Sequence, residues 1–456
     1  MLDTLMKRFA EGAPMALMVG GLLERFLSAD ELDDWFDRTS EHQYTRELLF
    51  YTVFELMSHV VCGMQRSVHA AFQKTLREVG VSVASVYNKL NGIEPAVSAA
   101  LVCYSREEMA PVLLRLGGAR ACWLKGYRVK ILDGNCLAAT EHRLEPLRRQ
   151  PAAVLPGKTL VVYNPAWEMV IDVVCEGDGH AQERGLVEQL LPGMQPRDAW
   201  VADRNFCTRG FLQAIAARGA FFVIRQHGNL GWEPISPLLE VGRTATGTVY
   251  EQEVALPAED GRGLRCRRVV LRLDKPTRDG DWEMAILTSL PHQDASACQG
   301  AEIYYGRWRI EEAFRPVTQH LHAEINTLAY PPAALFGFGL ALVAFNLLAV
   351  VKGALRAVHG TDPIDKELSG YYLAVELAST YQGMMIAIPA EQWRLFREAS
   401  TEQLAQLLLT LAEHVELRRY RKHPRGPKKP VSKAPRDPAV PHVSTARLLA
   451  QHRGHR

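Results

Sequence analysis

One short polar segment contains residue types that bind phosphate and metal ions. It covers residues 304–314 and reads YYGRWRIEEAF. In a helix, Tyr304, Arg307 and Glu311 would be spaced at i, i+3 and i+7 and would point to the same side. Arginine binds phosphate in a bidentate fork, tyrosine donates to phosphate oxygens, and carboxylates bind hard divalent cations. The segment therefore indicates a nucleic-acid backbone as ligand, although an amphipathic helix with solvated charges explains it equally well.

Two aspartates follow apolar runs that are typical of β-strands. Asp133 lies in YRVKILDGN (127–135), and Asp203 lies in AWVADRN (199–205). If each strand ends at its aspartate, both carboxylates project into the cleft that the sheet makes. Each motif alone also fits an ordinary turn or a helix cap. Together with Glu311, the aspartates supply three oxygen donors for two divalent ions about 3.5–4 Å apart, which would activate a water or hydroxyl against a phosphodiester.

The elements around these aspartates have the periodicity of an α/β fold. Short apolar runs rich in β-branched residues predict strands, and they occupy residues 127–135, 158–164, 168–176, 199–205 and 220–226. Residues 180–191 and 208–219 predict helices between them. We expect a mixed sheet with helices packed on it. Residues 248–290 predict further strands joined by Gly, Asp and Pro turns, which would form an all-β insertion just before the polar segment.

The first 120 residues predict a helical region. Ser28 and Glu31 have the spacing of a capping box ahead of an apolar pattern. Residues 76–90, LREVGVSVASVYNKL, predict one helix ending at Gly80 and another beginning after Ser82, as in the second half of a helix-turn-helix. In that motif four side chains would face DNA, namely Ser85, Tyr87, Asn88 and Lys89. Plain packing of two helices explains the same turn.

The uncharged segment of residues 330–351, YPPAALFGFGLALVAFNLLAVV, is long enough to span a bilayer. It is solitary, begins with two prolines and contains Asn346. We expect a helix buried on all sides in a large core, with a membrane span as the alternative.

Composition indicates an ordinary globular chain with a basic end. The 456 residues leave room for roughly three domains of about 150 residues. The net charge is +2, but residues 418–456 hold twelve Lys and Arg residues against one acid. This proline-rich segment, which includes Lys428 and Lys429, predicts a mobile tail that binds polyanions. The eight cysteines show no CxxC pair and the first thirty residues no signal peptide, so we expect a reducing, cytoplasmic compartment.

Taken together, these motifs resemble the DDE transposases of bacterial insertion sequences, specifically the insertion-sequence-four family. That family has a ribonuclease-H-like core with a β-rich insertion and a signature of Tyr, two residues, Arg, three residues, Glu, six residues and Lys. Tyr304, Arg307 and Glu311 match this signature, but Thr318 stands at the lysine position. Arg315, nearly one turn earlier, is a candidate substitute for the missing charge. The resemblance covers about residues 45–430.

The resemblance implies a role for each matching residue. Asp133, Asp203 and Glu311 would bind two Mg²⁺ ions, with Mn²⁺ as a possible substitute, and the spacing from Tyr304 selects Glu311 over Glu312. Tyr304 and Arg307 would contact phosphate near the transposon end. The partners would be double-stranded DNA, both terminal inverted repeats and target, and a second copy of the chain in a synaptic homodimer, with no membrane. The enzyme would work in the bacterial cytoplasm, on the nucleoid.

The expected organisation has six parts. These are a helical DNA-end-binding domain (1–120), a first core part (125–228), a β-rich insertion (229–298), a second core part with the catalytic glutamate (299–360), a helical region (361–417) and a basic tail (418–456). Two other functions remain open: a decayed transposase that occupies inverted repeats without cleavage, favoured by Thr318, and another metal-dependent nuclease on the same fold.

Overall fold

Helices make up the N-terminal part of the described chain. The computed structural model describes residues 4–42, 48–79, 81–137, 140–141, 145, 148, 155–257, 263–277, 280–308, 310, 321–322, 324–325 and 327–422. The first helices are α1 (Thr4–Gly12), α2 (Pro14–Phe26), α3 (Ala29–Thr39), α4 (Phe50–Val61), α5 (Val68–Val79), α6 (Val83–Gly92) and α7 (Pro95–Leu116). Their apolar residues recur at helical spacing and are buried together, which explains why this segment is helical.

Two serines begin helices here, and only one of them caps its helix as expected. Ser28 precedes α3, but its side chain makes no hydrogen bond to the helix backbone. It bonds the Glu31 side chain instead, so the predicted capping box is wrong. Ser82 does cap α6, because its Oγ accepts a hydrogen bond from the backbone N–H of Ser85 at 3.2 Å. Gly80 lies outside the described residues.

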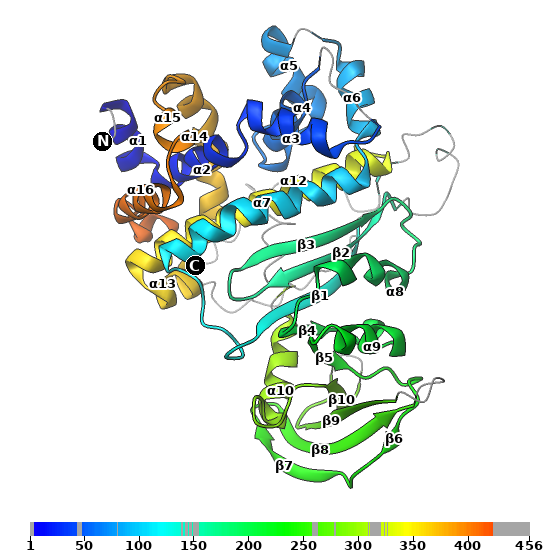
Figure 1. Cartoon of the computed structure of the whole chain (residues 1–456). Coiled ribbons are helices and arrows are strands. Elements are labelled where there is room, and N and C mark those ends of the chain that lie inside the picture. The colour runs from blue at the N-terminus through cyan, green and yellow to red at the C-terminus, as the bar shows by residue number, and fades with distance from the viewer. Residues whose placement is uncertain are drawn as a thin grey trace, which may run out of the picture. The chain divides into compact units, whose positions relative to one another are not determined.

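The long apolar segment forms α12 (Pro331–His359), a helix of the protein core. Among the described residues, α12 is the one helix that is long and apolar enough to cross a membrane. In its most apolar stretch of 18 residues, 89% is buried inside the protein. It packs along α7 and against β3 (Met169–Glu176), as Figure 1 shows. The buried Asn346 side chain joins the three: it accepts from the Val170 backbone N–H at 2.8 Å, and donates to the Val170 carbonyl at 2.9 Å and to Ser105 Oγ at 3.0 Å. The expected buried helix is therefore observed.

A mixed sheet lies beneath this helix. Its first five strands are β1 (Arg128–Cys136), β2 (Lys158–Asn164), β3, β4 (Asp198–Ala202) and β5 (Phe221–Arg225), in the spatial order β3-β2-β1-β4-β5. Strands β1, β2 and β3 pair antiparallel, whereas β4 pairs parallel with both β1 and β5. The connections contain α8 (Glu183–Leu186), the 3-10 helices η2 (Val187–Gly193) and η3 (Arg204–Phe206), and α9 (Arg209–Ala217).

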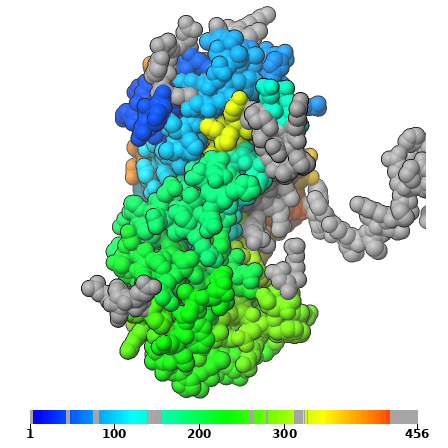
Figure 2. Space-filling model, turned by 90° about the vertical axis from the view of Figure 1, so that its right-hand side faces the viewer, coloured from blue at the N-terminus to red at the C-terminus, as the bar shows by residue number. Residues whose placement is uncertain are grey.

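The β-rich segment after β5 extends this sheet, because one of its strands is hydrogen-bonded to β5. It contains β6 (Glu233–Pro234), β7 (Leu239–Thr244), β8 (Gly247–Leu256), β9 (Leu264–Leu273) and β10 (Glu283–Thr288). Strand β10 pairs antiparallel with β5, so one ten-stranded sheet runs through both segments of the described chain. In Figure 2 the green and yellow-green surfaces of the two segments adjoin each other. The sequence predicted strands within residues 248–290, where β8, β9 and β10 lie, but it did not predict this shared sheet.

Helical elements lie at the start of the polar segment and after it in the sequence. α10 (Ala297–Tyr305) starts with a capping box between Ser296 and Gln299 and continues into the 3-10 turn η4 (Gly306–Trp308). After α12 come α13 (Thr361–Glu367), α14 (Gly370–Ala387), α15 (Arg394–Arg397), α16 (Thr401–Glu413) and the 3-10 turn η5 (Leu417–Tyr420). α14 and α16 pack against α2. Segments from both ends of the described chain therefore share one helical core.

Candidate active site

The two aspartates come from neighbouring parallel strands and stand side by side. In the β1–β4 ladder, Leu132 pairs with Ala202, so the next residues along the two strands are Asp133 and Asp203. Because the register is shared, both side chains leave the sheet on the same face, and adjacent strands are about 4.8 Å apart. Two carboxylates at this spacing are suited to bind divalent cations jointly.

The local backbone differs between the two positions. β4 ends at Ala202, and Asp203 then caps η3, with its Oδ1 accepting from the Arg204 N–H at 2.6 Å. β1 continues to Cys136, so Asp133 lies inside the strand and not at its end. The expected strand-end position of Asp133 is therefore wrong, because β1 keeps pairing with β2 beyond it. The shared register still brings the two carboxylates together.

Arg307 lies next to the two aspartates and forms an ion pair with Asp133. Its Nη1 lies 3.6 Å from Asp133 Oδ2, and only 8% of the residue is exposed. Burial by itself would lower the pKa of the guanidinium, but Tyr304, Asp133 and Asp203 together raise it above its ordinary value. Arg307 is thus held firmly charged against both aspartates.

Tyr304 lies next to Arg307 at the end of α10. It is 4% exposed, and its hydroxyl shares a side-chain hydrogen bond with Arg307. Burial, with a smaller contribution from Asp203, raises the pKa of Tyr304 to about 12, although Arg307 opposes the shift. The tyrosine therefore stays protonated near neutral pH and can donate a hydrogen bond.

The polar segment is not the single continuous helix that its spacing predicted. α10 ends at Tyr305, and Gly306 to Trp308 form a 3-10 turn. A side chain at Gly306 would collide with the Trp123 ring, because a Cβ would lie 2.6 Å from it. The close packing of this indole accompanies the change of helix type, which the sequence could not show. Tyr304 and Arg307 nevertheless meet at the aspartates.

Several predicted site residues fall outside the described residues. They are Glu311, Arg315, Thr318, Lys428 and Lys429, together with the alternative Glu312. In the described ranges no group of three His, Cys, Asp or Glu residues is placed to hold a metal ion. Asp133 and Asp203 fit a divalent ion as two of its oxygen ligands, and the cationic Arg307 occupies the adjacent position.

The expected DNA-facing side chains of α6 point in different directions. Asn88 is exposed, as a DNA contact requires, and Ser85 is half-buried with its hydroxyl 2.9 Å from that of Ser82. Tyr87 packs against the hydrophobic core. Lys89 turns inward: its Nζ lies 4.9 Å from the centre of the Phe36 ring, and burial lowers its pKa. This packing of Lys89 disfavours the predicted DNA contact.

Two polar residues that the sequence pattern did not single out contact the segments that follow the aspartates. Glu183, the first residue of α8, accepts a hydrogen bond from the side-chain amide of Asn205 at 2.5 Å. Asn205 follows Asp203 by two residues in ADRN, and this closeness to a predicted metal ligand could have indicated it. Nothing in the sequence around Glu183 indicated this contact.

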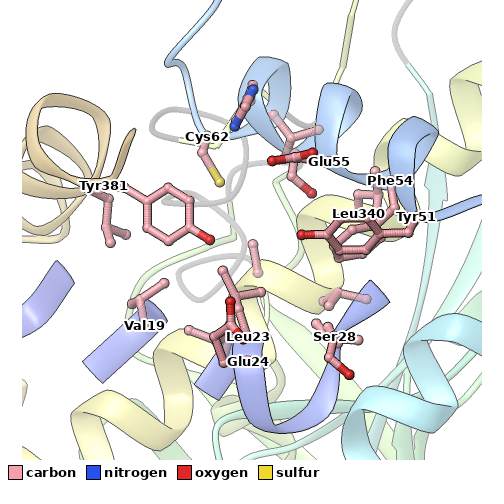
Figure 3. Close-up of a pocket in the computed structure, with 18 of the residues that line it drawn as sticks. Val19, Leu23, Glu24, Ser28, Tyr51, Phe54, Glu55, Cys62, Leu340 and Tyr381 are labelled. Atoms are coloured by element: carbon pink, nitrogen blue, oxygen red, sulfur yellow. The ribbon is translucent and has the colours of Figure 1, made fainter. Parts of the chain in front are cut away.

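A separate cavity of about 250 Å³ lies among the helices (Figure 3). Val19, Leu23 and Leu340 supply apolar walls, and Tyr51 and Tyr381 turn their hydroxyls toward it. Of the predicted catalytic and DNA-binding residues that the structure describes, none lines this cavity. The cavity is thus lined by residues other than Asp133, Asp203, Tyr304 and Arg307.

Comparison with known proteins identifies the domain that holds the aspartates. Residues 125–347 match the family described as the transposase DDE domain. This range contains Asp133, Asp203, Tyr304 and Arg307, so the assembled side chains all lie within it. The part of the chain that holds the aspartates is therefore similar to the DDE domain of transposases.

Individual relatives agree with this family. The "probable transposase for insertion sequence element IS5377" of Geobacillus stearothermophilus is 28% identical over 42% of this chain and 48% of its own length. The protein y4zB of Sinorhizobium fredii, also named as a transposase, is 30% identical over 36% of this chain and 45% of its own. The chain thus spans about half the length of these relatives. A piggyBac transposase synaptic complex with hairpin DNA aligns over 84% of each chain with a TM-score of 0.38 and 12% identity.

Proposed function

We propose that this protein cuts and joins DNA as a transposase, using a ribonuclease-H-like core. The observation that carries the proposal is the register of β1 and β4, which places Asp133 beside Asp203 with Arg307 against them. The strand order β3-β2-β1-β4-β5, three antiparallel strands followed by two parallel ones, supports the ribonuclease-H-like assignment. Both carboxylates face the side on which α10 and η4 present Tyr304 and Arg307.

In this proposal, Asp133, Asp203 and Glu311 hold the metal ions. Two Mg²⁺ ions held there would supply the charge that activates the attacking oxygen and neutralises the leaving oxygen of a phosphodiester, and Mn²⁺ could replace them. Asp133 and Asp203 fix the ions to the rigid sheet. Arg307, charged and buried beside them, offsets negative charge at the scissile phosphate, and Tyr304 orients the guanidinium through its hydroxyl. The burial of Arg307 beside Asp133 supports a contact with the phosphate that reacts.

The reaction begins with hydrolytic nicking at the end of the element. The freed 3′-hydroxyl then attacks target DNA, either directly or after forming a hairpin on the opposite strand. The N-terminal helices, with Asn88 exposed on α6, recognise the terminal inverted repeats, and two copies of the chain join two ends. The basic residues of 418–456, Lys428 and Lys429 among them, add affinity that falls with salt. The work takes place on the bacterial nucleoid, without a membrane.

A cleavage assay tests this proposal. Purified protein is incubated with Mg²⁺ and a labelled duplex that carries the terminal repeat of its own element. Nicking at the 3′ end of the element is expected, and Asp203→Asn is expected to bind the repeat without nicking it. The matched control is Asp178→Asn, an exposed aspartate in the loop after β3. Equal nicking by the wild type and Asp203→Asn would overturn the assignment of the site.

A second function is favoured by one residue. Thr318 replaces the signature lysine and removes a positive charge from the expected DNA contact, with Arg315 as the candidate substitute. A decayed transposase would therefore occupy inverted repeats without cutting them. In the same assay it would bind the repeat and fail to nick it in either Mg²⁺ or Mn²⁺.

A further inference from the structure

A third carboxylate, that of Glu183, lies against the backbone next to Asp133. If Gly134 carried a Cβ, that atom would be 2.4 Å from Glu183 Cδ and 2.6–2.7 Å from its two oxygens. A Cβ atom essentially never lies this close to a non-bonded atom. The Glu183 carboxylate therefore occupies the space that a side chain at position 134 would need. The glycine after Asp133 thus leaves room for Glu183.

Glu183 approaches the strand from the face opposite to Asp133. Successive residues of a strand point to opposite faces, so a side chain at position 134 would leave the sheet away from Asp133 and Arg307. Lys130 lies four residues before Gly134 in β1, so its side chain is on the same face of the sheet. Its Nζ lies 3.5 Å from the carbonyl of Gly193 in η2. α8, which carries Glu183, leads directly into η2. The carboxylate is therefore behind the site and does not belong to the metal-facing group.

The same carboxylate also holds the turn that follows Asp203. Its Oε2 accepts from Asn205 Nδ2 at 2.5 Å, and the neighbouring Arg184 donates from Nε to the Asn205 carbonyl at 2.8 Å. Asp203 caps this turn through its bond to the Arg204 N–H. One residue of α8 thus touches the backbone directly after the first aspartate and the side chain two positions after the second.

We propose that Glu183 is a positioning residue that sets the separation of Asp133 and Asp203. It links β1 to η3 across the end of β4, where backbone pairing between the two strands has stopped at Leu132 and Ala202. Without this link the η3 turn can shift relative to β1, and the two carboxylates lose the spacing that joint metal binding needs. The inference deepens the proposed function and rests on it.

Gly134→Ala gives a selective way to break the link. The backbone of Gly134 has no positive φ, so alanine fits the strand, and the colliding atoms are the movable end of Glu183. The new methyl group should push the carboxylate off Asn205 at little cost to folding. Glu183→Gln, in contrast, keeps an oxygen that can accept the bond from Asn205.

The test measures Mn²⁺ binding by the full chain, with free Mn²⁺ followed by electron paramagnetic resonance. Glu183→Ala, Asn205→Ala and Gly134→Ala should each weaken Mn²⁺ binding about tenfold or more, whereas Glu183→Gln should bind nearly as well as the wild type. Thermal midpoints should stay within about 3 °C of the wild type. Glu188→Ala, at an exposed position in η2, is the matched control and should change neither quantity.

A double variant tests whether Glu183 and Gly134 act through the same contact. If Glu183 and Gly134 act through one contact, Gly134→Ala should add no further loss in a Glu183→Ala background. Asp203→Asn serves as the reference for the site. If Asp203→Asn weakens Mn²⁺ binding and the Glu183, Asn205 and Gly134 variants do not, the positioning role is wrong and the proposed function stands. If Asp203→Asn also leaves Mn²⁺ binding unchanged, the proposed metal site itself is wrong.

Discussion

Two polar clusters are built into the same sheet, and they differ in how their groups are paired. At β3, the neutral amide of Asn346 makes hydrogen bonds of 2.8–3.0 Å to Val170 and Ser105. At β1 and β4, Asp133, Asp203 and Arg307 carry formal charges that sum to −1, and the ion pair seen between them spans 3.6 Å. The first cluster is neutral, while the described residues of the second have a negative formal net charge.

The location of the first cluster explains its role. The β2–β3 ladder shifts register between Val162 and Tyr163, and Val170 stands at this irregularity. Asn346 supplies the donor and the acceptor that the interrupted ladder requires at Val170. A buried polar group with such partners stabilises the fold, whereas concentrated like charge lowers stability and is kept for function. The following changes test this distinction, beginning with the largest expected effect.

Asp203→Asn should produce the largest change, and in activity alone. Removing a metal ligand should raise the barrier to DNA cleavage by several kcal/mol, on the order of a thousandfold in rate. The free energy of unfolding should be unchanged or higher by up to about 1 kcal/mol, since repulsion between the carboxylates is relieved. Cleavage rates and urea unfolding measure the two quantities, and a clear loss of stability would show that Asp203 is a structural residue.

Asn346→Leu should act in the opposite way. Leucine has a similar size but leaves the N–H and C=O of Val170 buried without these partners, which should lower the free energy of unfolding by about 3 kcal/mol. Urea denaturation followed by far-ultraviolet circular dichroism measures the loss. A decrease below about 1 kcal/mol would mean that the amide does not support the irregular ladder.

His59 should make folding stability depend on pH in a defined window. Burial, assisted by Lys74, lowers the pKa of His59 to about 4, below about 6.5 in the unfolded chain. The unfolded state therefore binds the extra proton first, so this stability is fully present above pH 6.5 and is lost as the pH falls toward 4. Between pH 7.5 and 5.0 the loss from this residue should be about 2 kcal/mol. His59→Gln should flatten the profile by that amount, and an unchanged profile would show that His59 is not buried neutral.

Lys89→Met should give the smallest effect. Because Nζ of Lys89 rests over Phe36 and not in solvent, the substitution should change unfolding by less than about 1 kcal/mol. It should also leave the salt dependence of DNA binding unaltered, whereas a lysine on phosphate would lower the slope by about 1. Asn88→Ala, at the exposed neighbour, is the comparison and should weaken binding to the repeat.

Local patterns in the sequence were sufficient for part of this structure. Asp133 and Asp203 were recognised because each follows a β-branched run, and their meeting needs only that the two strands be parallel neighbours. The pairing of β5 with β10 could not be predicted, because it joins segments whose apolar patterns fit many registers. The break after Tyr305 and the contact of Glu183 with Gly134 depend on side chains distant in sequence, Trp123 in the first case.

The central claim is that Asp133 and Asp203 bind a divalent ion together, and iron-directed cleavage tests it most directly. Fe²⁺ replaces Mg²⁺ in the full chain, ascorbate and peroxide generate hydroxyl radicals at the bound ion, and mass spectrometry locates the backbone cuts. We expect cuts near both Asp133 and Asp203, suppressed by excess Mg²⁺ and absent in Asp133→Asn. Cuts confined to other segments, or unaffected by Mg²⁺ and by Asp133→Asn, would contradict the claim.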